Sequence, residues 1–89
     1  MILIKNKEEL AGMRRAGAQT GQILHEVVSK VAPGVTTAEL DAYAAELSKE
    51  VGGIPAFYGY HGFSGNISAS VNEEIVHGVP GSRMIRDGD

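Results

Sequence analysis

The spacing of the apolar residues changes once along this 89-residue chain, at Pro55, and that change limits the folds open to it. Before Pro55, apolar side chains recur every three or four residues, which is typical of helices that bury one face. After it, apolar and polar side chains alternate from Ile67 to Asn72, which indicates a half-buried strand. The sequence therefore predicts an α/β fold of the α+β kind, in which helices precede strands.

Two helices are expected in the part of the chain before this change. Asn6 and Thr36 each stand three positions before a glutamate, a spacing in which side chains satisfy free amide groups at a helix start. Pro33-Gly34 ends the first helix, because proline disfavours the helical state in the residue before it, and Gly52-Gly53 ends the second. The result is a helical hairpin whose apolar faces need a sheet, or an equally apolar surface, to cover them.

A short sheet is expected in the last third of the chain. Ile75, Val76 and Val79 indicate a second strand, with a turn over residues 72–74 between the two strands. Asp87-Gly88 is a hairpin-type turn that normally introduces a further strand, and none follows within the 89 residues. We therefore expect the sheet to be incomplete in this chain.

Composition and charge exclude several classes of function. No cysteine is present, which excludes a disulfide framework and a thiolate metal site. The net charge is -3 and the eight basic residues are scattered, so no surface for nucleic acid or for an anionic membrane is expected. No apolar run approaches the roughly 18 residues of a membrane span, and the apolar start of the chain is too short for a signal peptide. A cytoplasmic protein with one domain at most is expected.

The strongest functional signal lies in two segments, residues 57–63 and 71–80. They hold four of the five aromatic residues and two of the three histidines, interspersed with glycines that let a ligand approach the backbone. The aromatic side chains are interpreted as pocket walls. A phosphate-binding loop is disfavoured, because no Gly-Lys-Ser/Thr follows the glycines.

The three histidines lack the spacing of a local metal site, which would place two of them one helical turn apart. His25 is expected at the flank of the first helix, whereas His61 and His77 are open to a structural or a functional role. Glu73 and Glu74 are neighbours whose side chains should point apart, which favours a solvated turn over an acid–base pair.

Four segments of the sequence follow one another in a specific order and spacing. They are Ala32–Asp41, Gly59–Phe63, Ser70–Pro80 and Asp87–Asp89. This series resembles the N-terminal third of the bacterial-type methionine aminopeptidases of peptidase family M24, and the resemblance covers essentially all 89 residues. It implies a pita-bread fold in which two helices pack on an antiparallel sheet, with residues 1–89 as the N-terminal part of one catalytic domain.

The resemblance also implies an activity with its cofactors and partners. The activity is that of a metal-dependent aminopeptidase, a hydrolase that removes the initiator methionine from nascent proteins whose second residue is small. Two divalent ions, of Co, Mn, Fe, Zn or Ni, are the implied cofactors, and a monovalent cation is implied near the carbonyls of Asn72 and Glu74. The implied partners are the N-terminus of a nascent polypeptide and the ribosome, and the protein is expected to be a monomer.

Site residues follow from the same resemblance. His77 stands where the family keeps a histidine that hydrogen-bonds the scissile peptide, so it is the expected catalytic residue and a substrate-binding residue. His61 is expected beside the substrate pocket, where it helps to bind substrate. The positions that line the pocket for the methionine side chain are Phe57, Tyr60, Phe63 and Ser68. Relatives often have tyrosine and cysteine where this chain has Phe63 and Ser68, which should change the polarity of the pocket without abolishing methionine binding.

The metal ligands are expected outside these 89 residues. The family's two aspartates, one histidine and two glutamates are implied to lie beyond Asp89, and Asp87 belongs with Asp89 to the turn before the first of them. The 89-residue chain alone is therefore expected to be inactive. Two alternatives stay open: a relative of the same fold that cleaves Xaa-Pro peptides, and a non-catalytic interaction module whose histidines are structural.

Overall fold

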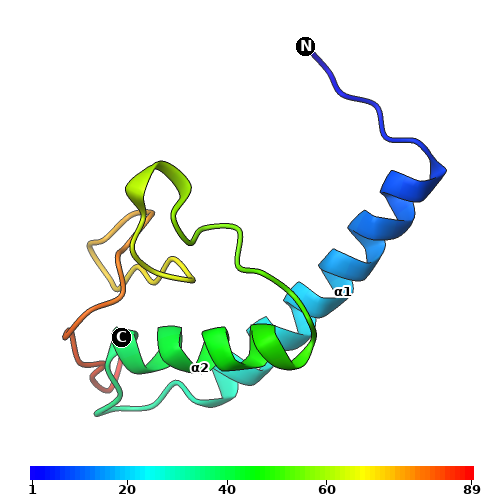
Figure 1. Cartoon of the computed structure of the whole chain (residues 1–89). Coiled ribbons are helices and arrows are strands. Elements are labelled where there is room, and N and C mark those ends of the chain that lie inside the picture. Colours follow the sequence, from blue (N-terminus) through cyan, green and yellow to red (C-terminus); the bar gives the residue numbers. More distant parts are fainter.

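A computed structural model describes all residues from 1 to 89 and contains two α-helices and one short 3-10 helix. Helix α1 spans Lys7–Ser29, α2 spans Thr37–Glu50 and η1 spans Tyr60–Gly62. The N-terminal end of α1 points away from the other elements, and α2 lies beside its C-terminal half (Figure 1). The chain after α2 forms a loop region above α2, and the C-terminus returns to the start of α2 (Figure 1). Neither α-helix combines the length and the apolar character needed to cross a membrane.

Both helices begin where their capping residues predict. The Asn6 side-chain oxygen accepts a hydrogen bond from the Glu9 amide at 2.8 Å. At α2, Thr36 Oγ1 accepts from the Glu39 amide at 3.2 Å, and Glu39 Oε2 accepts from the Thr36 amide at 3.1 Å. These two bonds complete a capping box. The predicted helical hairpin is confirmed, since α1 and α2 are in contact and hydrogen bonds local in sequence fix where each helix starts. The first helix ends at Ser29, before the Pro33-Gly34 predicted to end it.

The core is small and lies between α2, the C-terminal half of α1 and the segment around Ile85. Eight of the 89 residues are buried, so most apolar side chains keep some contact with solvent. The buried apolar residues are Val27, Leu40, Ala44, Leu47 and Ile85. Along α1, Leu10, Met13 and Leu24 are exposed. Most of the apolar face of α1 is therefore uncovered within these 89 residues, which is the surface that the predicted sheet was expected to cover.

No strand forms within residues 1–89, so the predicted antiparallel sheet and its two strands are corrected for this chain. The one isolated bridge joins Thr36 to Met84 and lies outside both predicted strands. Between those two segments a single backbone hydrogen bond forms, from the Ala69 amide to the Gly78 carbonyl at 2.9 Å. A ladder needs a row of such bonds, and alternating polarity alone cannot supply the neighbour that makes them. Ile75, in the second predicted strand, is exposed.

The turns predicted in this region are confirmed. The Glu74 amide donates to the Val71 carbonyl at 3.1 Å across residues 72–73. The Asp89 amide donates to the Arg86 carbonyl at 3.1 Å, and Gly88 has a positive φ of 92° that favours glycine. The alternating segment also has the expected orientation at its start, since Ile67 packs against the core.

The segment 81–85 is tied to the start of α2 by a network of hydrogen bonds. Ile85 exchanges two backbone hydrogen bonds of 2.8 Å with residues 34–35. The buried Thr37 hydroxyl accepts from the Gly81 amide at 2.8 Å and donates to the Gly81 carbonyl at 3.2 Å. These contacts anchor the far end of the loop region, so residues 51–80 are held over α2 from both ends.

Candidate functional site

Three aromatic rings from separate parts of the loop region meet in what we call the aromatic cluster, formed by Phe57, Phe63 and His77. The ring centroids of Phe57 and Phe63 lie 5.6 Å apart with a 45° tilt. The centroids of Phe57 and His77 lie 6.5 Å apart, and the His77 ring meets Phe57 edge to face at 69°. Such distances are those of attractive aromatic pairs. The structure therefore brings together three of the residues predicted to form the site.

Tyr60 and His61 form a separate pair at the tip of the loop. Their ring centroids lie 4.3 Å apart at 82°, and both side chains are exposed. The loop closes beneath them, because the Gly59 amide donates to the Phe63 carbonyl and the Phe63 amide donates to the Tyr60 carbonyl, both at 2.9 Å. Tyr60 and His61 are thus joined to the aromatic cluster through the backbone of Phe63.

Ser68 lies with Phe57 on the wall of a hollow of about 490 Å³ between α1, α2 and the loop region. Apolar side chains form much of the wall. They include Ile23, Val51, Ile54, Pro55 and Ile67. Phe57 is the residue common to this hollow and to the aromatic cluster, whereas His77 does not line the hollow. The predicted pocket residues are therefore distributed over two neighbouring features that share one phenylalanine.

Three residues other than glycine have a left-handed backbone, and all lie in or near the predicted site. They are His61 (φ 48°), Asn72 (φ 52°) and His77 (φ 55°). A residue with a Cβ adopts this conformation at a cost on the order of 1–3 kcal/mol; asparagine and histidine do so more often than most residues, and such strained residues cluster at functional sites. Backbone geometry thus distinguishes the two histidines that the sequence left open from His25, which is exposed on α1 as predicted.

Asp41 on α2 is a residue of the site region whose part the sequence interpretation missed. Its carboxylate accepts three hydrogen bonds, from the Asn66 amide at 2.7 Å, the Asn66 side chain at 3.0 Å and the Ile67 amide at 2.9 Å. These bonds hold the chain just before Ser68 against α2. An aspartate inside a helix is a signal for such a partner, because its side chain favours hydrogen bonds to other backbone groups over helix formation.

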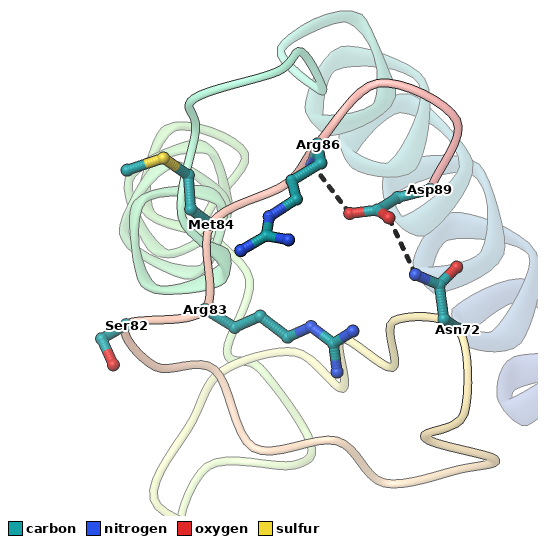
Figure 2. A pocket seen from close by; sticks show the side chains of 6 residues that line it. All are labelled: Asn72, Ser82, Arg83, Met84, Arg86 and Asp89. Atoms are coloured by element: carbon teal, nitrogen blue, oxygen red, sulfur yellow. Dashed lines mark hydrogen bonds between the residues drawn. The ribbon is translucent and has the colours of Figure 1, made fainter.

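A second hollow, of about 540 Å³, lies beside the turn at residues 72–74 (Figure 2). The side chains that line it come from that turn and from the C-terminal segment. They are Asn72, Ser82, Arg83, Met84, Arg86 and Asp89. Asn72 Nδ2 donates to one oxygen of Asp89 at 2.8 Å, and the Arg86 amide donates to the other at 2.8 Å (Figure 2). These bonds, the backbone amide first, lower the pKa of Asp89.

The two neighbouring glutamates of the turn converge, so the expectation that their side chains point apart is wrong. Arg83 Nη1 lies 2.8 Å from Glu73 Oε1 and 3.5 Å from Glu74 Oε2. Glu74 is drawn toward Arg83 because its other oxygen accepts the Val71 amide at 2.8 Å. The hydrogen bonds from Arg83 lower the pKa of Glu73 and, in return, raise the pKa of the guanidinium. Both glutamates serve to fix the turn, with Glu73 highly exposed.

The residues of this chain do not fit a divalent metal centre. No group of three or more histidine, aspartate or glutamate side chains converges closely enough to hold an ion. Two expectations stay predictions: the metal ligands lie beyond Asp89, and a monovalent cation binds at the carbonyls of Asn72 and Glu74.

Residues 11–89 match the profile of metallopeptidase family M24. The chain belongs to this family. The resemblance predicted from the sequence is therefore confirmed, and the match includes α1 from residue 11 onward, all of α2 and every residue of the predicted site.

Sequence relatives of this M24 chain are methionine aminopeptidases. Methionine aminopeptidase 1 of Bacillus subtilis is 48% identical over 89 residues, which are 100% of this chain and 36% of that protein. The methionine aminopeptidase of Clostridium perfringens is 44% identical over 89 residues, with the same two coverages. The M24 chain thus spans 36% of the length of these relatives.

Solved structures of two further methionine aminopeptidases match the backbone of the M24 chain. The enzyme from Thermotoga maritima gives a TM-score of 0.95 at 36% sequence identity, and the one from Rickettsia prowazekii gives 0.93 at 31%. Each match covers 99% of this chain and 36% of the other. The helices and the loop region therefore have the arrangement found in these enzymes, although no strand forms within residues 1–89.

Proposed function

We propose that this M24 chain is the substrate-binding part of a methionine aminopeptidase, a hydrolase that removes the initiator methionine from nascent proteins with a small second residue. The observation that carries the proposal is the aromatic cluster. The ring centroid of Phe57 lies 5.6 Å from that of Phe63 and 6.5 Å from that of His77, on a backbone that matches a methionine aminopeptidase with a TM-score of 0.95.

The pocket residues have the chemistry that a methionine side chain needs. An unbranched thioether gains from dispersion and from contact of its sulfur with aromatic ring edges. In the proposed pocket, Phe57 and Phe63 supply ring surface, Tyr60 closes the outer side, and Ser68 supplies a hydroxyl at the rim. His61, paired with Tyr60, is assigned to substrate binding at the same side of the pocket.

His77 is proposed as the catalytic residue of this chain. Its ring lies beside that of Phe57, so a peptide whose methionine side chain contacts the Phe57 ring would bring its first peptide bond near the imidazole. A histidine N–H at that position donates to the scissile peptide and stabilises the charge that develops there. The same hydrogen bond orients the substrate before reaction.

The complete enzyme is proposed to use two divalent ions, of Co, Mn, Fe, Zn or Ni, held by residues outside 1–89. We assign no metal-dependent step to the 89 residues, because none of their side chains form a fitting group. A monovalent cation at the carbonyls of Asn72 and Glu74 is part of the proposal. It is supported by the left-handed backbone at Asn72, which turns the chain sharply at this place.

The fold, the cellular location and the partners of the enzyme are part of the same proposal. Residues 1–89 form the N-terminal part of one catalytic domain with the pita-bread fold. Chain segments outside them supply the strand neighbours that residues 67–72 and 75–79 need to join an antiparallel sheet. The enzyme acts as a cytoplasmic monomer on the N-termini of nascent chains at the ribosome. The exposed apolar face of α1 supports the larger domain, since further chain would cover that face.

A hybrid enzyme tests the proposal. Residues 1–89 replace the aligned segment of methionine aminopeptidase 1 of Bacillus subtilis, and methionine release from a Met-Ala-Ser peptide is measured with Mn²⁺ or Co²⁺. We expect release at a rate within about tenfold of the parent enzyme, since the backbone arrangement is shared. A folded, metal-loaded hybrid that releases no methionine, or that cleaves only an Xaa-Pro peptide, contradicts the proposal.

Two controls make the result specific. His25→Ala in the hybrid removes an exposed histidine of α1 and should leave the rate unchanged. Residues 1–89 alone should release no methionine, because no group of three or more of their His, Asp and Glu side chains converges to hold an ion.

A further inference from the structure

The backbone of Gly78, directly after His77, is held against residues 69–70 by two hydrogen bonds, which we call the clamp. The Gly78 amide donates to Ser70 Oγ at 2.9 Å, and the Gly78 carbonyl accepts from the Ala69 amide at 2.9 Å. The two backbones approach so closely that a Cβ at position 78 would overlap the Ala69 carbonyl. This position therefore requires glycine, and Ser70 supplies the one side-chain oxygen that the Gly78 amide uses.

The clamp matters for His77 because the histidine backbone is in an unfavourable conformation. Its φ of 55° lies in the left-handed region, where a residue with a Cβ persists only if its surroundings hold it. On the N-terminal side, the side chains of Ile75 and Val76 are exposed, so burial there does little to fix the chain. The side chain itself contacts Phe57 at its edge. The hydrogen-bonded peptide of Gly78 is thus the nearest anchor of the His77 backbone.

We propose that Ser70 is a positioning residue for His77. By accepting the Gly78 amide, its hydroxyl holds His77 in the left-handed conformation that places the imidazole beside the Phe57 ring. This inference rests on the proposed function, in which that imidazole donates to the scissile peptide. Ser70 does not line the hollow lined by Ser68, and its side chain is bonded to the peptide that joins His77 to Gly78, so its effect on reaction passes through the backbone of residues 77–78.

The kinetic test compares two substitutions at position 70 in the metal-loaded full-length protein. Ser70→Ala removes the acceptor and should lower kcat for Met-Ala-Ser by about three- to tenfold, the range expected for one hydrogen bond, with KM changed less than about twofold. Ser70→Thr keeps the oxygen and should restore kcat. Ser82→Ala removes an exposed serine hydroxyl from another segment and serves as the matched control. Unchanged kcat in Ser70→Ala, or no restoration by Ser70→Thr, overturns the inference.

Amide hydrogen exchange gives a second readout that needs no catalytic activity. In the unsubstituted protein the Gly78 amide should exchange more slowly than the amide of the exposed neighbour Val79, and Ser70→Ala should remove most of that difference. Equal exchange of the two amides in the unsubstituted protein overturns the clamp. If the unsubstituted protein releases no methionine while Gly78 is protected by Ser70, the proposed function fails and the clamp stands, so the two failures are distinguishable.

Discussion

The rings of Phe57 and His77 meet edge to face, with centroids 6.5 Å apart and planes inclined at 69°. The two residues are 20 positions apart in sequence (77 minus 57), and the one regular element between them is the short 3-10 helix η1. Their contact depends on the anchors at the two ends of the loop region, the hydrogen bonds of Asp41 at residues 66–67 and those of Thr37 at Gly81. A site on loops is thus positioned by α2, the best-packed element of the fold.

Phe57→Ala tests whether the shared phenylalanine forms the pocket wall. Removing the ring takes away its contacts with Phe63 and His77, and we expect kcat/KM for Met-Ala-Ser to fall at least about three- to tenfold, the equivalent of one aromatic pair. Tyr58→Ala removes the exposed adjacent ring and should change kcat/KM little. Steady-state kinetics of the two variants is measured in parallel. Equal losses of kcat/KM would show that the aromatic cluster has no special part in binding.

Asp41→Ala tests the attachment of the loop region to α2. Three donors lose a charged acceptor, so the free energy of unfolding should fall by about 2–3 kcal/mol. Urea unfolding monitored by circular dichroism measures it. Glu46→Ala, at an exposed position of the same helix, should change stability by less than about 0.5 kcal/mol. A change in Asp41→Ala no larger than that in Glu46→Ala would mean that other contacts hold the loop.

These cases show which parts of the structure the sequence could predict. The helix starts at Asn6 and Thr36 were predictable because their hydrogen bonds reach only three residues along the chain. The role of Asp41 was not, since its partners lie 25 and 26 residues away and only the folded backbone brings them near. The prediction of two strands failed for the same reason. A strand is defined by the strand that pairs with it, and the alternation at Ile67 indicates only that one face is buried, not which segment pairs with it.

The same distinction between local and long-range contacts applies to the candidate site. The clustering of aromatic residues and glycines marked residues 57–63 as the functional segment. Spacing alone could not indicate that His77 lies against Phe57, and only the resemblance to a known family assigned both to substrate binding. The left-handed backbone of His77 is a property of the folded chain that side-chain patterns do not reveal.

Gly78→Ala tests the close approach of the two loop segments. The added methyl group would overlap the Ala69 carbonyl, so the loop must shift, and we expect a loss of about 1–3 kcal/mol in stability together with reduced methionine release. Gly81→Ala is the matched control, because the nearest atom to a Cβ there, the Val79 carbonyl oxygen, is 3.8 Å away. If Gly78→Ala is as stable and as active as Gly81→Ala, the segments are not in this close contact.

The ion pair of Arg83 and Glu73 makes a prediction about pH. The pKa of Glu73 is lowered in the folded state, so the pair stabilises the turn at neutral pH and this contribution is lost as the pH falls through the lowered folded-state pKa. Arg83→Gln should raise the pKa of Glu73 toward its ordinary value, as measured by NMR titration of the carboxylate. Arg86→Gln is the control, because Arg86 is not among the groups that set the pKa of Glu73. Identical titration curves in the two variants would contradict the pairing.

His77→Ala in the metal-loaded full-length protein is the most direct test of the central claim, which is that residues 1–89 bind the substrate of a methionine aminopeptidase. The measurement is kcat for methionine release from Met-Ala-Ser, together with metal content per protein. We predict that kcat falls by about 100-fold, as for the loss of one donor to a developing charge, while metal content is unchanged. A loss of metal in proportion to the loss of kcat, or no loss of kcat at all, would contradict the account.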